Sequence, residues 1–332
     1  MITERLRLDP ARVTGEITSA LRRQVGEILG RSGVVVAMSG GVDSAVCAAL
    51  AAQTLGPRRV LGLGLPERES DEQSLHLARD WAGALGISFI AQDITPILEA
   101  CGCYSLRDAA IRRLVPEYGD GWRCKLVLHR GSDSDGLNVC YVAVQPPGGE
   151  VRQLRLPSRE FLEIVAATNF KQRVRTMSTY HHADRLHYAV VGTPNRLEYD
   201  QGFFVKGGDG LADVKPIAHL YKSQVYELAE HLGVPAAIRH RPPTTDTYSL
   251  PQTQEEFFFS LPLGDLDLVL EAHNEGRPAA TAAAELGFGP EQIESAYRDI
   301  DRKRRTTRYL HAPPLLVQPV LEALPAPGGE GA

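Results

Sequence analysis

A buried strand that leads directly into a glycine-rich turn is the feature that most constrains the fold of this chain. Residues 33–38 form a continuous apolar run, which is typical of a parallel strand covered by helices on both faces. The turn that follows has the sequence Ser39-Gly40-Gly41-Val42-Asp43-Ser44, and residues 43–54 have the alanine-rich composition of a helix. Ligands of open α/β sheets bind at the carboxyl ends of the strands. The turn is therefore predicted to be a binding loop of an α/β domain.

The elements around this turn predict a doubly wound parallel sheet with a Rossmann-like arrangement. Two further strands are predicted over residues 59–65 and 87–91, and residues 70–73 between them have the polar pattern of a helix start. A helical stretch over 158–183, in one piece or in two pieces joined near residues 168–169, precedes another apolar strand at 187–192. Strands that alternate with helices in this way form parallel sheets with right-handed crossovers.

The alternation is interrupted between residues 122 and 156. Three strand-like segments separated by the polar turns 131–136 and 146–149 predict a β-meander inserted in the α/β domain. From residue 264 onward the chain is predicted to be mostly helical. We therefore expect a single domain over residues 1–320 that includes the insertion at about 122–156, and a flexible tail over 321–332, where Pro and Gly are frequent.

Composition and charge argue against several classes of protein. The net charge of −5 over 332 residues gives no indication of a nucleic-acid-binding surface. No apolar run approaches the roughly 20 residues of a membrane helix, and the N-terminus lacks the apolar core of a secretory signal. The five cysteines include no CxxC pair, so reduced thiols are expected. We expect a cytoplasmic enzyme with no nucleic-acid or membrane partner.

The residues of the turn predict that it binds phosphate. Its two glycines allow the backbone to approach an anion closely, and free N–H groups at the helix start bind phosphate oxygens. The hydroxyls of Ser39 and Ser44 add donors, whereas Asp43 would repel phosphate unless a cation lay between them, so we expect Mg²⁺ there. The turn is neither GxxxxGK[ST] nor GxGxxG, which argues against Walker-type kinases and dehydrogenases. A tight turn without a ligand is the structural alternative.

The turn resembles the pyrophosphate loop of the N-type ATP pyrophosphatases, which cleave ATP between the α and β phosphates. Later segments resemble the NAD synthetase family in particular. Residues 169–177 are similar to its NxKxRxRM helix, 192–213 to its GTxxxxE…GFFTKYGDGGAD segment, and 220–225 to its LYKxQV helix start. Residues 243–246 resemble its PTAD segment. For the basic residues of 169–177, a solvated helix face is the plain alternative.

This resemblance implies roles for individual residues. It implies an ATP site formed by Ser39, Gly40, Gly41, Asp43, Ser44, Arg173, Thr193, Lys222 and Thr244. It implies a site for the carboxylate substrate formed by Arg173, Lys206, Asp209 and Asp213, and a Mg²⁺ pair formed by Asp43 and Glu198. Asp43, Lys222 and Asp209 are the implied catalytic residues, with Asp209 a candidate for the group that takes a proton from ammonium.

The resemblance also implies an activity and its partners. ATP would adenylate the nicotinate carboxylate of deamido-NAD with release of pyrophosphate, and ammonia would convert the adenylate to NAD and AMP. A glutaminase domain like that of glutamine-dependent relatives has no room in 332 residues. Free ammonia, or ammonia from a separate enzyme, is therefore the implied nitrogen donor, and a homodimer is the implied assembly.

Three departures from the family pattern keep other functions open. Residues 122–156 lengthen the segment before Asn169, and residues 194–196 and 247–251 differ from the usual ones. A ligase of the same chemistry that acts on another carboxylate is therefore the main alternative. A nucleotide-binding regulatory protein without turnover is a third hypothesis, against which the combination of phosphate-loop, lysine and acidic residues argues.

Overall fold

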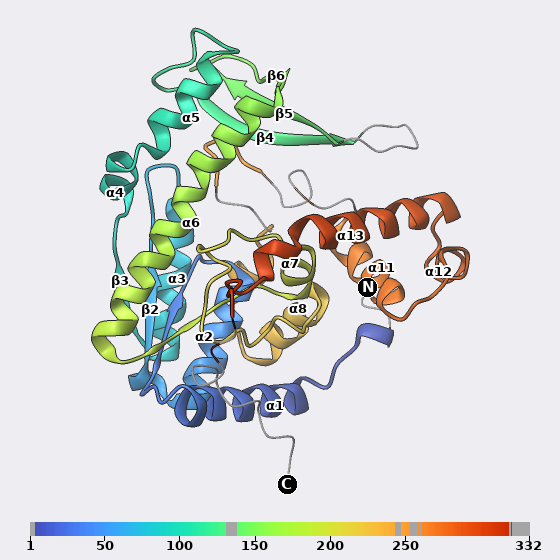
Figure 1. The fold of residues 1–332 in the computed structure, drawn as a ribbon. Coiled ribbons are helices and arrows are strands. Elements are labelled where there is room, and N and C mark those ends of the chain that lie inside the picture. The colour runs from blue at the N-terminus through green and yellow to red at the C-terminus, as the bar shows by residue number, and fades with distance from the viewer. Residues whose placement is uncertain are drawn as a thin grey trace.

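The sheet expected from the strand pattern lies at the centre of the protein. The computed structural model describes residues 4–130, 138–242, 247–252, 258, 261–318 and 320. The central strands are β1 (Val34–Ala37), β2 (Val60–Gly64), β3 (Ser88–Ala91) and β7 (Ala189–Val191), in the order β3-β2-β1-β7 (Figure 1). Each pairing within this order is parallel, so the prediction of a parallel α/β fold is confirmed.

Helices cover both faces of this sheet because β1 directs alternate side chains into two cores. Val34 and Val36 pack with side chains of α1 (Pro10–Arg22), α2 (Val42–Leu55), α3 (Glu72–Leu85) and α8 (Lys222–His231). Val35 points to the opposite face, where it joins side chains of α4 (Thr95–Ala100), α5 (Cys103–Arg112) and α6 (Ser158–Leu186). This two-sided burial explains why the strand is apolar at every position.

Helix α6 is one continuous helix of 29 residues, so the possibility of two pieces joined near Thr168 is wrong. The hydroxyl of Thr168 donates to the carbonyl of Ile164 in the same helix, which leaves the backbone ladder intact. The N-terminal end of α6 lies beside the meander, and the helix then runs along the sheet to its far end (Figure 1).

The C-terminal region is helical, as expected. Its helices α11 (Leu263–Asn274), α12 (Ala279–Leu286) and α13 (Pro290–His311) share a core with Leu197 of α7 (Arg196–Gln201) and Tyr221. Short helices complete the described chain: η1 (Glu4–Leu6), η2 (Arg23–Ile28), η3 (Pro57–Arg59) and α9 (Ala236–Arg239).

The predicted β-meander is present as a separate antiparallel sheet. Strands β4 (Arg123–Arg130), β5 (Asn138–Gln145) and β6 (Arg152–Arg155) pair in the order β4-β5-β6. The meander has its own core, shared with α5 and the first turns of α6. Residues 247–252 lie along β4, where the N–H of Leu250 donates to the carbonyl of Cys124 at 3.1 Å and the N–H of Cys124 donates to Ser249 Oγ at 2.9 Å.

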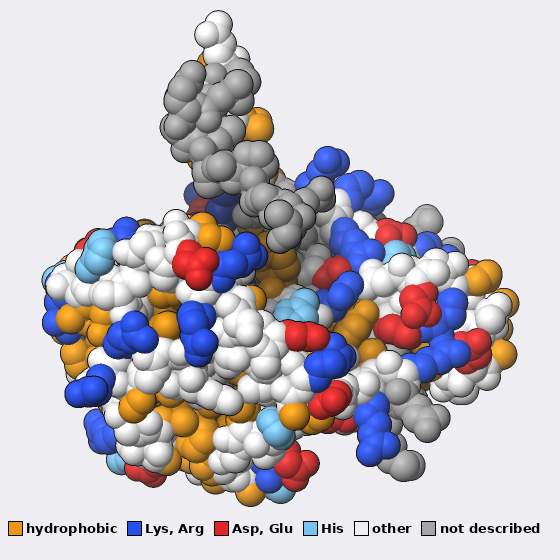
Figure 2. Space-filling view, turned by 90° about the horizontal axis from the view of Figure 1, so that it is seen from below, with side chains coloured by type: hydrophobic (Ala, Val, Ile, Leu, Met, Phe, Trp, Pro, Cys, Tyr) orange, Lys and Arg blue, Asp and Glu red, His pale blue; other side chains and the backbone are white. Residues whose placement is uncertain are grey.

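The surface of the protein carries charges of both signs. Basic and acidic side chains are interspersed on the face shown in Figure 2. Within the described ranges, no helix is both long and apolar enough to cross a membrane. The expected turn at 131–136, residues 243–246 with Thr244, and the tail 321–332 lie outside the described residues.

Candidate active site

A cavity of about 840 Å³ lies at the carboxyl edge of the sheet. Strands β1 and β7 are neighbours, but the chain leaves β1 towards β2 on the other side, so the loops after β1 and β7 diverge and leave a crevice between them. Residues of the loop 39–44 and of 192–194 line this crevice. Further walls come from α6, from the start of α8, from α13 and from the meander.

The loop after β1 is held in shape by its two serines. Ser44 Oγ accepts the N–H of Ser39 at 3.2 Å and donates to the carbonyl of Gly41 at 3.0 Å, and Ser39 Oγ accepts the N–H of Gly41 at 3.3 Å. Helix α2 begins immediately after Gly41, so its first N–H groups face the cavity side of the loop. This is the arrangement in which a helix start binds an anion.

Gly40→Ala is expected to deform this loop. Gly40 has a φ of 75°, and a Cβ at this position would overlap the backbone oxygen of Ser74 at the start of α3. A strained backbone of this kind costs about 1–3 kcal/mol. We expect a lower melting temperature and weaker ATP binding, measured by thermal denaturation and titration calorimetry. Gly41→Ala is the matched control because Gly41 has a φ of −92° and should accept alanine; an unchanged melting temperature in Gly40→Ala would contradict the prediction.

Asp43 and Lys222 form an ion pair at the wall of the cavity. Lys222 is 3% exposed. Burial opposes the positive charge of Lys222, but Asp43 and Glu198 outweigh it and raise the pKa of the ammonium group well above its ordinary value. Lys222 therefore remains a cation beside the phosphate loop.

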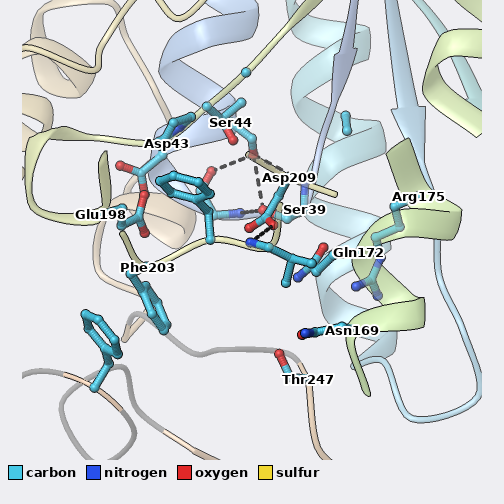
Figure 3. Close-up of a pocket in the computed structure, with 18 of the residues that line it drawn as sticks. Ser39, Asp43, Ser44, Asn169, Gln172, Arg175, Glu198, Phe203, Asp209 and Thr247 are labelled. Atoms are coloured by element: carbon cyan, nitrogen blue, oxygen red, sulfur yellow. Dashed lines mark hydrogen bonds between the residues drawn. The ribbon is translucent and has the colours of Figure 1, made fainter. Parts of the chain in front are cut away.

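Asn195 connects the two carboxylates predicted to hold a metal. Its side-chain nitrogen donates to Asp43 Oδ1 at 3.1 Å. Asn195 is also the N-cap of α7, where its side-chain oxygen accepts the N–H of Glu198 at 3.2 Å and the Glu198 carboxylate accepts the N–H of Asn195 at 3.1 Å. Figure 3 shows the Asp43 and Glu198 carboxylates next to each other.

This pair of carboxylates fits the coordination that Mg²⁺ uses at phosphate sites. Among the residues that the structure describes, no group of three or more His, Cys, Asp or Glu side chains could hold a metal ion. Mg²⁺ commonly takes only one or two carboxylates from the protein and completes its shell with water and substrate phosphates. Asp43 and Glu198 both line the cavity and supply this number of ligands.

The basic segment of α6 faces the cavity. Arg173 and Arg175 line it, and Arg175 lies across from the phosphate loop in Figure 3. The Nε of Arg173 donates to the carbonyl of Lys206 at 3.3 Å, and the Nε of Arg175 donates to the carbonyl of Leu65 at 3.3 Å. Lys171 is fully buried. The three basic residues therefore do not form one solvated face: Lys171 is buried, Arg175 is half-buried and Arg173 is exposed at the cavity.

Two of the residues expected to bind the second substrate lie at the cavity wall. The N–H of Val205 donates to Asp209 Oδ1 at 2.8 Å. Asp209 is open to the cavity, but the protein atoms packed around it raise the pKa of its carboxyl to about 6, against the opposing effects of Val205 and Arg175. Lys206 Nζ donates to the carbonyls of Tyr309 at 2.6 Å and Ala312 at 3.1 Å, and so holds the end of α13 against the cavity.

Asp213 lies apart from the other residues expected to bind the second substrate. It does not line the cavity. Its Oδ2 accepts the N–H of Val190 at 2.7 Å, and its Oδ1 accepts the hydroxyl of Tyr180 at 3.1 Å. Asp213 thus braces the strand β7, and the structure does not bring it together with the other residues expected to bind the second substrate. Of the other implied residues, Ser39, Gly41, Asp43, Ser44, Arg173, Thr193, Glu198, Lys206, Asp209 and Lys222 all line the cavity.

Comparison with known proteins identifies the family of this chain. The family model described as NAD synthase matches residues 13–114 and 136–309. The chain belongs to the NAD synthase family. It is 55% identical over 311 residues to a protein of Mesorhizobium japonicum named NH(3)-dependent NAD(+) synthetase, which covers 94% of this chain and 98% of that protein. A protein of the same name from Rhizobium meliloti is 53% identical over 96% of this chain and 95% of its own.

Solved structures agree on the fold. The chain superimposes on the NH3-dependent NAD synthetase of Campylobacter jejuni with a TM-score of 0.61 at 19% identity, over 94% of this chain and 100% of that one. A structure of NMN synthetase from Francisella tularensis gives a TM-score of 0.60 at 23% identity, over 95% and 100% of the two chains. At these identities the likeness concerns the fold alone.

Part of one wall of the cavity lies outside the match to the NAD synthase family. Residues 115–135 are not matched, and they include the whole of β4. Leu126, Val127 and Leu128 of β4 nevertheless line the cavity, together with Cys140 of β5 and Tyr248. The meander and residues 247–251, two of the departures noted in the sequence, therefore form one wall.

Sequence reasoning missed two residues that position the site. Asn195 could have been found, since an Asn followed three residues later by a Glu is the signature of a capping box. Asp267 of α11 could not: its carboxylate accepts the N–H of Lys222 at 3.1 Å and of Ser223 at 2.7 Å, across about 45 residues of sequence. Asp267 is fully buried and caps the start of α8, which carries Lys222.

Proposed function

We propose that this protein is an ammonia-dependent ligase that converts deamido-NAD to NAD at the expense of ATP. The observation that carries the proposal is that one cavity contains both halves of the required site. The phosphate loop, Lys222 and the carboxylates of Asp43 and Glu198 line it, and Arg173, Lys206 and Asp209 line the same cavity. A reaction between an ATP phosphate and a second anionic substrate needs both.

The chemistry requires activation of a carboxylate, which is a poor electrophile. The nicotinate carboxylate attacks the α-phosphorus of ATP, the bond to the β-phosphate oxygen breaks, and an acyl-adenylate and pyrophosphate result. Ammonia then attacks the carbonyl carbon, the bond from that carbon to the AMP oxygen breaks with its electron pair leaving on AMP, and the nitrogen loses a proton to give the amide. The protein contributes by placing the reactants in line and by stabilising the developing negative charge.

The side chains divide this work by position. Ser39, Ser44 and the N–H groups of the loop bind the phosphates, with Lys222 as a fixed cation beside them. Asp43 and Glu198 hold Mg²⁺, which supplies positive charge to the leaving pyrophosphate when it is bound. Arg173 pairs with a phosphate of the second substrate, and Asp209 orients the nicotinate end.

Assembly and location follow as parts of the same proposal. The protein forms a homodimer in the cytoplasm and receives ammonia either from solution or from a separate ammonia-producing enzyme. Size-exclusion chromatography with light scattering tests the dimer, because a monomer at working concentration would contradict it.

The activity is tested with purified protein, Mg-ATP, deamido-NAD and ammonium chloride. NAD and AMP in equal amounts, quantified by chromatography, are the expected products. Folded protein that binds ATP but forms neither product would rule the proposal out. A ligase for another carboxylate is the second candidate, favoured by the part of the cavity wall that β4 forms, since β4 lies outside the family match. Pyrophosphate release that depends on a different acid would identify it.

Asp209 is expected to give the adenylation step a pH dependence. With a pKa of about 6, its carboxyl is ionised at neutral pH and becomes protonated as the pH falls through 6. If the ionised form orients the acceptor, the rate falls over that range. Exchange of labelled pyrophosphate into ATP measures this step without ammonia, whose own protonation would confuse the result. Asp209→Asn keeps the acceptor oxygen for the Val205 N–H, and it should give a lower rate that is flat between about pH 5 and pH 8. A wild-type profile in this variant would assign the titration to another group.

A further inference from the structure

Lys171 is a buried cation that the proposed mechanism does not use. It lies on α6 and is 0% exposed. Its ammonium group has three partners: Glu67 Oε1 at 2.9 Å, Glu69 Oε2 at 2.6 Å and the carbonyl oxygen of Thr247 at 2.8 Å. A lysine has three N–H donors, so each has one acceptor.

The charges around Lys171 are balanced without Thr247. Glu69 also accepts two hydrogen bonds from Arg107 at 2.8 Å, and Glu67 accepts the hydroxyl of Tyr104 at 2.6 Å. Burial opposes the ionised form of Glu69, but Lys171 and Arg107 outweigh it and hold the pKa of this carboxyl below its ordinary value. Buried ion clusters often add little stability compared with an apolar core. We therefore look for the role of this cluster in the segments that its hydrogen bonds join.

The partners of Lys171 belong to two walls of the cavity. Glu67 and Glu69 lie in the loop after β2, whose Pro66, Ser70 and Asp71 line the cavity. Thr247 lines it from another side, below Asn169 and away from Ser39 and Ser44 in Figure 3. Lys171 joins the two walls through one ammonium group.

Residues 247–252 contact both the meander and α6. The bonds of this segment to β4 of the meander include those from the side chains of Arg123 and Lys125 to the carbonyls of Ser249 at 2.8 Å and Pro251 at 3.0 Å. Tyr248 is buried in the core of the meander with Ile164 of α6, and its hydroxyl is hydrogen-bonded to Thr168 of the same helix. Thr247 and Tyr248 therefore both attach this wall to α6, and the Thr247 carbonyl is also linked through Lys171 to the loop after β2.

We infer that Lys171 is a positioning residue for the proposed reaction: its ammonium group fixes the wall of Thr247 and Tyr248 relative to the loop after β2. This inference rests on the proposed function. A wall that is held before substrate arrives does not have to be ordered on binding, which lowers the cost of association and keeps the reactants aligned. Loss of the contact should then reduce turnover and affinity without removing any group that touches substrate.

The test compares two double variants that each remove one buried cation and one of its carboxylate partners. Lys171→Met with Glu67→Gln removes the contact to Thr247 and leaves Glu69 paired with Arg107. Arg107→Met with Glu69→Gln is the control, because it leaves Lys171 paired with Glu67 and bonded to Thr247. Both pairs should lower the melting temperature similarly. Only the first should lose activity, with kcat/KM for deamido-NAD reduced about tenfold to a hundredfold, the effect of one lost bond to a charged group.

Hydrogen exchange reports directly on whether the segment 247–252 is held in place. The N–H of Leu250 donates to the carbonyl of Cys124, and its exchange should become faster in the Lys171 pair and stay near the wild-type rate in the control. Equal activity in the two pairs, or lost activity with unchanged exchange at Leu250, would overturn the inference. Lys171→Leu with Glu67→Gln, which also leaves no donor at position 171, takes the place of the pair if the pair does not fold, and wild-type kcat/KM in that variant would also overturn it. A wild-type protein that makes no NAD contradicts the proposed function instead, and the exchange comparison still tests the positioning role.

Discussion

Asp43→Asn is expected to abolish measurable formation of NAD. Asp43 lies in the phosphate loop, beside Glu198, and is paired with Lys222 and Asn195. The substitution keeps the shape of the side chain but removes the negative charge that attracts Mg²⁺ and balances Lys222. We expect kcat/KM for Mg-ATP to fall by about 10²–10³ or more, the size seen when one preorganised electrostatic contact to a transition state is lost. A steady-state assay over a range of Mg²⁺ concentrations measures this.

The control for Asp43→Asn is Asp93→Asn. Asp93 follows β3 at the same edge of the sheet, but it is exposed and accepts only the N–H of Thr95 at 2.8 Å among the bonds described. It should keep wild-type activity. Glu198→Gln retains a capping side chain at the start of α7, so it should fold normally and lose activity as Asp43→Asn does. Full activity of either variant at limiting Mg²⁺ would exclude the carboxylate pair as the metal site.

Lys222→Met is expected to reduce kcat/KM for ATP as much as Asp43→Asn does, because it removes a positive charge beside the phosphates. Lys222 supplies a buried positive charge between Asp43 and Glu198, and methionine of similar length leaves the two carboxylates to repel each other. ATP should bind more weakly, and kcat/KM for ATP should fall by about 10²–10³. Titration calorimetry with ATP in the presence of EDTA separates the loss of the lysine from any loss of the metal.

Lys125→Met is the matched control for this lysine. Lys125 lies on the meander, donates to the carbonyl of Pro251 at 3.0 Å and does not line the cavity. Its replacement should change stability slightly and ATP affinity not at all. If Lys222→Met bound ATP as tightly as the wild type, the ion pair with Asp43 would be structural and the proposed role of Lys222 would be wrong.

Much of the α/β body could be read from short stretches of sequence. The run 33–38 predicts a strand buried on both faces, because helix-covered parallel strands need apolar side chains at every position. The loop 39–44 predicts a phosphate site because only glycine accepts the backbone of position 40 and because serine and aspartate next to it have a defined chemistry. The meander was also predicted, since alternating segments between polar turns carry a local signal.

The resemblance to family motifs did not predict which neighbours each side chain of a motif contacts. In the segment 169–177, the sequence placed three basic residues on alternate positions, and it could not say which way each would point. The structure turns Arg173 and Arg175 to the cavity and buries Lys171 among acidic partners 102 or more residues away in the chain. Asp213 was assigned to the substrate by resemblance, yet its oxygens are engaged by β7 and α6.

By itself, the sequence determined the chemistry at the carboxyl edge of the sheet, because a strand, a glycine turn and a helix start are set by residues close together in the chain. The tertiary structure decided which distant side chains complete that site. Asn195 reaches Asp43 across 152 positions and Asp267 caps the helix of Lys222 across 45. The wall built from β4 and residues 247–252 exists only because two segments separated by about 120 residues pack together. Contacts of this kind depend on how elements pack, and no local pattern encodes them.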